Sequence, residues 1–178
     1  MEKGSKSEKK ALFQFNSNDS EEAVVLKFNL WSRYFFAKYF TSNDAPFHKK
    51  IDTYNLKAYR GEISSFTDIA FRGAAKTART KLFIGYVIAN DTDHYRRYIK
   101  VLSADGVNSR QIVTDVYNML AKVGTFYPEV FEKTGLKREE TMGSFTTSTG
   151  VKMTSDTVNT EQRGAIQEDA RPDFIWFE

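Results

Sequence analysis

Apolar side chains spaced three and four residues apart recur through the first half of the chain. The clearest stripe begins after Ser20, a residue type that caps helices, and consists of Val24, Phe28, Trp31, Phe35 and Tyr39. Pro46 suits the first position of a second helix, and Gly61 ends that helix. The spacing predicts amphipathic helices over residues 21–40, 46–59 and 76–90.

Short β-prone runs follow from residue 61 onward. They occupy residues 63–71, 98–103, 144–147, 151–154 and 174–177, and Ser148-Thr149-Gly150 favours a hairpin between the third run and the fourth. Asn108 and Gln111 have capping-box spacing at the start of another helix, which ends near Gly124. A shorter helical stretch is expected over residues 128–133. Strands that alternate with helices predict an α/β fold with a mostly parallel sheet flanked by helices.

The distribution of polar residues suggests three parts. Residues 1–20 are rich in Lys, Ser, Asn and Glu and are expected to form a flexible tail. Residues 21–60 are expected to form an N-terminal helical segment, and residues 61–178 the α/β core.

Composition narrows the chemistry further. The 178 residues include no cysteine, which excludes disulfides, thiol nucleophiles and Cys-ligated metals, and the two histidines are far apart in sequence. The net charge of +3 neither requires nor excludes a nucleic-acid partner. No apolar run reaches the roughly 18 residues that would cross a bilayer, so no membrane association is expected.

Residues 70–77 resemble a degenerate phosphate-binding loop. The consensus G-x-x-x-x-G-K-[ST] lies between a strand and a helix, and here the segment reads A-F-R-G-A-A-K-T, with alanine at both consensus glycines. Small residues at 73–75 leave room for backbone N–H groups to approach phosphates. Lys76 is expected to reach the β and γ phosphates, and Thr77 to hold Mg²⁺.

A carboxylate after the last β-prone run supplies the second half of such a site. Phe174-Ile175-Trp176-Phe177 is followed by Glu178, which has the form of a Walker B strand because Mg²⁺ needs an oxygen anion where the strand ends. The alternative is an ordinary core strand followed by a surface glutamate. The two segments together, with a βα unit between them, favour nucleotide binding.

The order of these elements resembles the N-terminal ATPase domain of the large terminase subunit of tailed bacteriophages, the motor that packages viral DNA. The resemblance covers roughly residues 24–178. Its most specific pieces are Tyr34-Phe35-Phe36 with Pro46-Phe47-His48, Arg72-Gly73-x-Ala75-Lys76-Thr77, Gly150-Val151 through Arg163-Gly164, and Arg171-Pro172-Asp173 with the four apolar residues that follow.

The resemblance implies a P-loop NTPase of the RecA-like (ASCE) type that hydrolyses ATP with Mg²⁺. The ATP-binding residues it implies are Arg72, Gly73, Ala74, Ala75, Lys76, Thr77 and, near the adenine, His48. Lys76, Arg72 and Glu178 would serve catalysis, and Thr77 and Glu178 would hold Mg²⁺. Arg163 would sense nucleotide or act across a subunit interface; the alternative is that it lies in an ordinary polar loop. For Arg72 the alternative is a solvated loop arginine without a direct role.

The resemblance also implies partners and a location. These are double-stranded DNA, the portal protein, the small terminase subunit and further copies in a homo-oligomeric ring on the capsid. The protein would lie in the host cytoplasm and transiently on the viral procapsid.

The chain departs from the family pattern at its carboxyl end. The family usually has Asp where this chain has Glu178, then a catalytic acid, and later a nuclease domain. A fragment or split gene product that is incomplete after the Walker B strand, with weak or no hydrolysis, is therefore expected. Two alternatives are a nucleotide-binding but inactive interaction module and an unrelated α/β domain in which the loop sequence is accidental.

Overall fold

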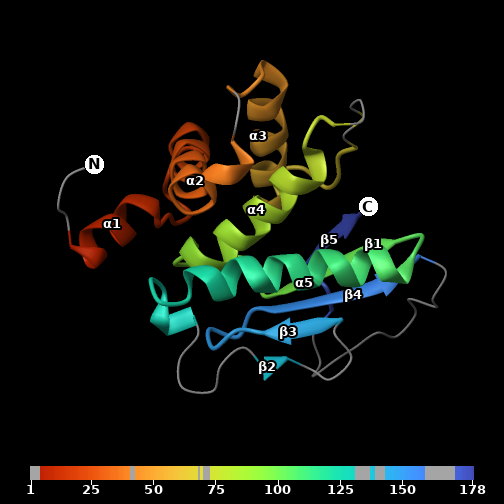
Figure 1. Cartoon of the computed structure of the whole chain (residues 1–178). Helices are drawn as coiled ribbons and strands as arrows, with labels where there is room; N and C mark the ends of the chain where they lie inside the picture. Colours follow the sequence, from red (N-terminus) through yellow and green to blue (C-terminus); the bar gives the residue numbers. More distant parts are fainter. Residues whose placement is uncertain are drawn as a thin grey trace. The chain divides into compact units, whose positions relative to one another are not determined.

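A computed structural model describes residues 5–40, 43–67, 69, 73–130, 137–138, 143–158 and 171–178 (Figure 1). The chain divides into two compact units, Met1–Tyr95 and Arg96–Glu178. The first unit is helical, and the second contains the sheet.

Four helices build the first unit. They are α1 (Lys6–Phe13), α2 (Glu21–Phe36, continued by the 3₁₀ turn η1, Ala37–Tyr39), α3 (Pro46–Arg60) and α4 (Lys76–Asn90). The Ser20 hydroxyl accepts a hydrogen bond from the Ala23 amide at 3.3 Å, as its position before the apolar stripe predicted. Pro46 is the first residue of α3, and Gly61 ends that helix with a φ of 73°, which confirms both boundary predictions.

Aromatic side chains form the core of the first unit. Phe28 and Trp31 on α2 contact Tyr86 on α4, with ring centroids 5.5 and 5.7 Å apart, and Phe28 also meets Phe83 at 5.6 Å. The Tyr86 hydroxyl donates to the carbonyl of Phe13 at 2.9 Å, so its one polar atom is satisfied inside the core. The apolar stripe predicted for residues 24–39 is therefore the packing face of α2.

The amino-terminal segment differs from the flexible tail that its polar composition predicted. Ser5 and Glu8 form a capping box at the start of α1, and Phe13 and Phe15 are buried. The amide of Phe15 donates to the carbonyl of Asn90 at 3.1 Å, and the amide of Thr92 donates to the carbonyl of Phe15 at 3.0 Å. Two apolar residues within a polar stretch are thus enough to fix it onto the end of α4.

The second unit contains a five-stranded sheet in the order β2-β3-β4-β1-β5. Its strands are β1 (Tyr98–Ser103), β2 (Lys137–Arg138), β3 (Ser144–Thr146), β4 (Lys152–Thr157) and β5 (Phe174–Phe177). β1 pairs in parallel with β4 on one side and β5 on the other, so that Val101 lies opposite Ser155 and Trp176. β2, β3 and β4 are antiparallel, which confirms the hairpin predicted around Gly150.

Helix α5 (Gly106–Val123) packs on β1, β3 and β4 through buried Ile112, Val116 and Leu120. Its cap is Asp105, whose carboxylate accepts from the Val107 amide at 2.8 Å. The capping box predicted at Asn108 is wrong, because the helix already begins at Gly106. The helical stretch predicted at 128–133 is the 3₁₀ turn η2 (Pro128–Val130), and the rest of it lies outside the described residues.

The strand predicted over residues 63–71 is the main secondary-structure error. Residues 63–67 and 69 are not in a strand, and residues 68 and 70–72 lie outside the described part of the chain. Phe66 instead stacks on Tyr54 of α3 at 5.8 Å, and Ile69 is 90% exposed. β-prone residues form a strand only where a neighbouring strand accepts their hydrogen bonds, and no strand in the described part of the chain pairs with residues 63–67.

The α/β class and the parallel centre of the sheet are confirmed. The predicted boundary at residue 61 is not the boundary between the units, because α4 packs with α2 and α3 and belongs to the first unit. Among the described residues, no helix combines the length and the hydrophobicity that crossing a bilayer requires.

Candidate nucleotide-binding site

The backbone before α4 turns through two left-handed residues. Gly73 has a φ of 90°, and Ala75, the amino-terminal cap of α4, has φ and ψ of 57° and 20°. Left-handed geometry is strained for a residue with a Cβ atom, and it is the geometry that glycine supplies at low cost. Ala75 occupies the position at which the phosphate-loop consensus has its second glycine, so the backbone there adopts a glycine-like conformation although the residue is alanine.

Lys76 and Thr77 are the first two residues of α4, and both are half-buried. The first turn of a helix presents backbone N–H groups without helical partners, and the helix dipole is positive there. The Ala75 carbonyl already accepts from the Arg79 amide at 2.9 Å, so the helix is formed from its first turn. The Lys76 ammonium group, the Thr77 hydroxyl and the first backbone amides of the helix therefore all belong to the first turn of α4.

His48, near the start of α3, supports this loop. Its Nδ1 accepts from the Ala45 amide at 3.1 Å, which places the ring proton on Nε2, and Nε2 then donates to the Ala74 carbonyl at 3.2 Å. The resemblance implied that His48 lies near the adenine of ATP. In the structure it contacts the loop backbone, and it therefore acts as a support of residues 73–75.

A buried ion-pair network holds the next turn of α4. Arg79 donates through Nε to Asp52 Oδ1 at 3.0 Å and through Nη1 to Asp44 Oδ1 at 2.8 Å, and its remaining nitrogen reaches both Asp52 and Asn29. The Asp52 side chain is fully buried, and 5% of the Arg79 side chain is exposed. Arg79 thus joins α4 to α2 and α3, and it is not a surface residue of an amphipathic helix.

Burial opposes charge on both buried partners. At Arg79 the effect of burial is outweighed by the hydrogen bonds and charges of Asp52 and Asp44, and the pKa of Arg79 is raised. At Asp52 burial raises the pKa of the carboxyl, while the hydrogen bonds from Arg79 and Asn29 oppose that shift. Because both oxygens of Asp52 accept hydrogen bonds, the geometry fits the ionised carboxylate and a charged guanidinium.

Asp44 pairs with two arginines and lies near the ring of His48. It pairs with Arg79 and with Arg33, each at 2.8 Å, and its Oδ1 lies 3.6 Å from His48 Nδ1. Burial acts to raise the pKa of Asp44, but Arg33 and Arg79 hold it below its ordinary value. The segment from Ala74 to Arg79 is therefore held by His48 at one end and by the ion pairs of Arg79 at the other.

Glu178 belongs to the second unit. Its amide donates to the Leu102 carbonyl at 2.9 Å and continues the pairing of β5 with β1, so the glutamate follows a parallel strand as the Walker B interpretation predicted. β5 is the edge strand of the sheet formed by the described residues, and its Ile175 and Phe177 are exposed. Lys76 and Thr77 lie in the first unit, and the structure describes the two halves of the predicted site separately.

Two predicted site residues, Arg72 and Arg163, lie outside the described residues, and so does Gly164. Within the described part of the chain, no three His, Asp or Glu side chains gather as a metal site. Mg²⁺ in phosphate sites is commonly held by one or two protein oxygens together with the phosphates. The Thr77 hydroxyl is a protein oxygen of this kind. The described residues form no metal site that consists of several carboxylates.

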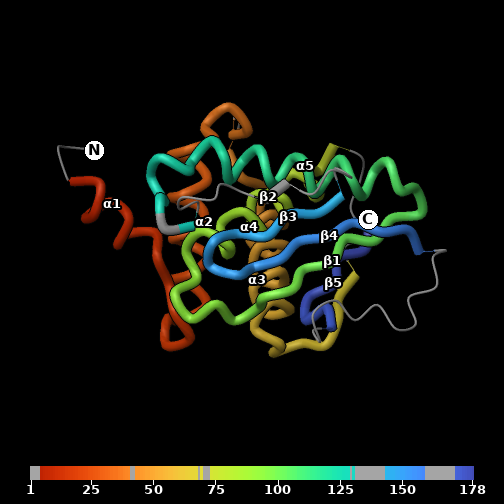
Figure 2. Tube along the Cα trace, turned by 90° about the horizontal axis from the view of Figure 1, so that it is seen from below, coloured from red at the N-terminus to blue at the C-terminus, as the bar shows by residue number. Residues whose placement is uncertain are grey.

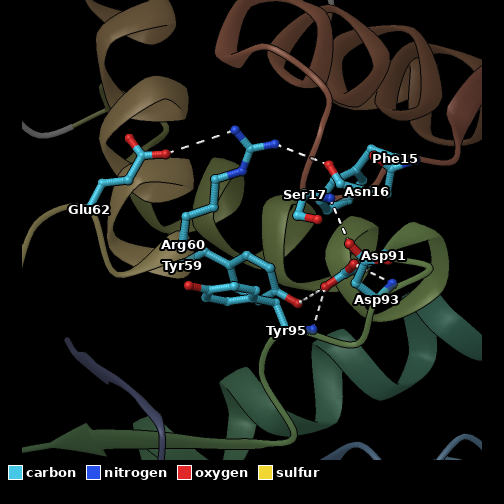
Figure 3. A pocket seen from close by; sticks show the side chains of 9 residues that line it. All are labelled: Phe15, Asn16, Ser17, Tyr59, Arg60, Glu62, Asp91, Asp93 and Tyr95. Atoms are coloured by element: carbon cyan, nitrogen blue, oxygen red, sulfur yellow. Dashed lines mark hydrogen bonds and ion pairs between the residues drawn. The ribbon is translucent and has the colours of Figure 1, made fainter.

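A pocket of about 210 Å³ lies elsewhere in the first unit (Figure 3). Asp91 is its central acceptor, with hydrogen bonds from the Tyr59 hydroxyl at 2.6 Å and the Tyr95 amide at 2.8 Å. Asp93 accepts from the Ser17 amide at 2.7 Å, and this bond lowers the pKa of Asp93. None of the sequence-predicted site residues lines this pocket, and its hydrogen bonds join the segment after α1 to the end of α4.

The sequence interpretation did not identify Asp44, Asp52 or Arg79. A signal was present. Arg79 continues the apolar stripe Leu82-Phe83-Tyr86, and Asp52 continues the stripe Asn55-Leu56-Tyr59, so a basic and an acidic residue each occupy a core position of an amphipathic helix. Opposite charges at two core positions indicate a buried pair, because a lone buried charge is very costly.

Comparison with known proteins adds no family. The chain matches no protein-family model, no curated protein and no solved structure. The case for function therefore depends on the residues and geometry of this chain.

Proposed function

We propose that the chain binds Mg²⁺–ATP at residues 73–77 and is the ATPase domain of a terminase large subunit. In this role it hydrolyses ATP to move double-stranded DNA into a viral procapsid. The fold is then a P-loop NTPase of the RecA-like type, working in the host cytoplasm and on the procapsid with the portal protein, the small subunit and further copies of itself.

The observation that carries the proposal is the conformation of Ala75. A left-handed residue directly before a helix that starts with Lys76-Thr77 is the helix half of a phosphate loop, whereas the strand that precedes the loop in the consensus is not formed by residues 63–67. The consensus glycines are absent from the sequence, yet the glycine-like backbone is present where the second one belongs. The strain at Ala75 supports a functional reason for this turn, since strained backbone is concentrated at ligand sites.

The residues of the loop have separate roles in this proposal. The backbone N–H groups of the first turn bind phosphate oxygens, and Lys76 neutralises charge on the β and γ phosphates. By the resemblance, the Thr77 hydroxyl and the Glu178 carboxylate would each hold Mg²⁺, which would supply further charge neutralisation. His48 keeps the Ala74 carbonyl turned away from the phosphates, because that carbonyl is occupied by the Nε2 proton.

Titration with a fluorescent ATP analogue tests the proposal. Lys76→Ala should weaken binding about 10-fold to 100-fold, since a charge-assisted contact contributes about 1.5–3 kcal/mol. Lys81→Ala, on the same helix, removes the same charge and should change the affinity little. Equal affinity of the parent and the Lys76 variant would exclude the phosphate-loop assignment.

Magnesium gives a second readout. Mg²⁺ should tighten ATP binding to the parent chain and should tighten it less in Thr77→Ala and Glu178→Ala. Equal tightening in all three proteins would contradict the metal assignment. Tight binding with no turnover, even with DNA present, would support the inactive interaction module over the motor.

A further inference from the structure

Helix α2 carries a second apolar stripe on the side opposite its packing face. Val24, Phe28 and Trp31 form the packing face and are buried, whereas Leu26 and Leu30 are 61% and 47% exposed. α2 is the orange-red helix that follows α1 in Figure 2. Residues four positions apart are neighbours on a helix surface, so the two leucines form one continuous apolar patch on the first unit.

Four further side chains of α2 border this patch. At about 100° per residue, Glu22 and Arg33 lie on one flank of the leucines, and Ala23 and Tyr34 lie on the other. Glu22 is exposed and forms no ion pair with another described residue. The Arg33 side chain binds Asp44 at 2.8 Å, is 42% exposed and has further N–H donors. The leucine face is defined here by these residues of α2: Glu22, Ala23, Leu26, Leu30, Arg33 and Tyr34.

We propose that the leucine face binds a second copy of this chain, with the two α2 helices antiparallel. A two-fold axis level with Phe28 places Leu26 of each copy beside Leu30 of the other, because the two residues are equally far from Phe28 along the helix. The same axis places Glu22 of each copy level with Arg33 of the other, to within about 1.5 Å along the helix. The apolar contact therefore has an acid opposite a base at each end.

The same register fits the other flank of the leucine face. Ala23 of each copy lies level with Tyr34 of the other to within about 1.5 Å, so a small side chain faces an aromatic ring that is 40% exposed. A parallel pair would instead place Glu22 beside Glu22 and Arg33 beside Arg33, and like charges side by side oppose association. The charge pattern of the leucine face thus favours a second copy in the antiparallel direction.

A pair through the leucine face is separate from the ring of copies in the proposed function. A two-fold pair uses the same surface on both copies, whereas a ring uses two different surfaces on each copy. The inference depends only on α2, so failure of the proposed ATP site would leave it unchanged. The leucine face is small, in the class of interfaces below about 1,200 Å² in total, so we expect a weak dimer with a dissociation constant on the order of 10–100 µM.

Sedimentation velocity of the full chain without nucleotide, over concentrations that bracket this constant, tests the pair. The parent should shift from monomer to dimer. Leu26→Glu combined with Leu30→Glu places carboxylates in the apolar contact and should weaken the dimer by about 100-fold or more. Val107→Glu is the matched control, because Val107 on α5 is also apolar and 63% exposed, and it should leave the dissociation constant unchanged. Thermal unfolding should give the same midpoint for all three proteins, since exposed substitutions change stability little.

Disulfide trapping tests the register. The chain has no cysteine, so Leu26→Cys and Leu30→Cys chains each carry a single thiol. In the proposed pair these two positions lie side by side, whereas two copies of the same position are about 6 Å out of level along the helix. A disulfide requires Cα atoms within about 7 Å of each other. A mixture of the two chains, one carrying a tag, should therefore form the mixed disulfide about 10-fold faster than either symmetric disulfide.

A parent chain that stays monomeric over this concentration range would overturn the proposal and leave the second unit or another protein as the occupant of the leucine face. A dimer that persists in the double glutamate variant would place the contact elsewhere on the chain. An equal loss of the dimer in Val107→Glu, or symmetric disulfides that form as fast as the mixed one, would overturn the proposal as well.

Discussion

At the scale of single residues, Ala75 is the most informative position in the first unit. A residue with a Cβ atom in the left-handed region costs roughly 1–2 kcal/mol, and glycine avoids most of that cost. Ala75→Gly should therefore raise the free energy of unfolding by about 1 kcal/mol in urea, with no change in the denaturant slope.

The neighbouring alanine provides the control. Ala74 is 3% exposed and is not among the residues with positive φ, so Ala74→Gly removes a buried methyl group and adds chain entropy without relieving strain. It should destabilise the protein by about 1 kcal/mol. Destabilisation by both substitutions would mean that Ala75 is not left-handed in solution.

Asp44 gives a second prediction at this scale, through pH. Its pKa in the folded state is below the ordinary value of 3.8, so the folded protein binds fewer protons than the unfolded chain in that range. Its contribution is fully present above 3.8 and is lost as the pH falls through the lowered folded value. Between about pH 6 and pH 3, the parent should therefore lose more unfolding free energy than Asp44→Asn.

Urea unfolding at several pH values measures this difference. Asp19 and Asp93 also have lowered pKa values, but they titrate in both proteins and cancel from the comparison. Parallel pH profiles for the parent and Asp44→Asn would show that the pairs with Arg33 and Arg79 do not hold the carboxylate in its ionised form.

At the scale of elements, the buried pair between α3 and α4 decides how well α4 is held. Arg79→Met leaves the Asp52 carboxylate buried without its cation and should cost about 3–5 kcal/mol. Combining Arg79→Met with Asp52→Leu removes both charges and should return the stability to within about 1 kcal/mol of the parent, or above it. Urea unfolding of the two variants checks this. If Arg79→Met alone lowers the free energy of unfolding by less than about 1 kcal/mol, the Arg79 side chain is exposed to solvent.

Helix boundaries were predictable from the sequence where one residue type controls them. Ser20, Pro46 and Gly61 each act on the backbone within a few residues, and the structure has the expected helix end at each. The prediction of a strand over residues 63–71 was wrong for residues 63–67 and 69, because a strand needs a pairing partner that the local sequence does not reveal. The cap of α5 failed because both Asp105 and Asn108 are capping residues, and spacing alone does not choose between them.

The residue types of the candidate loop could be predicted from the sequence, but the side chains that hold the loop in place could not. Lys76 and Thr77 were predicted because the phosphate-loop pattern names them, and the structure has them as the first two residues of α4. The roles of His48 and Arg79 required the packing of α3 against α4, since their partners Ala74 and Asp52 are 26 and 27 residues away in the chain. A contact at that separation is a property of the fold; the local sequence shows only that Arg79 and Asp52 each occupy a core position of their own helix.

At the scale of the whole molecule, the two units differ in architecture and in the predicted site residues that they carry. The first unit holds the candidate phosphate loop, and the second holds Glu178. The sequence predicted one continuous core from residue 61, because alternating helices and strands do not show which helix packs with which layer. The helical packing of α4 with α2 and α3 is therefore the largest difference between the predicted and the observed architecture.

The most direct test of the central claim is amide hydrogen exchange with and without a non-hydrolysable ATP analogue and Mg²⁺. At 100 times the dissociation constant, exchange that requires opening of the binding region should slow about 100-fold, and we predict this at the amides of residues 74–78. In Lys76→Ala, where binding is expected to be about 10-fold to 100-fold weaker, the slowing at the same ligand concentration should fall to about 11-fold to 2-fold. Protection found only around Tyr59, Asp91 and Tyr95, in the pocket of Figure 3, or found nowhere in the chain, would contradict the account.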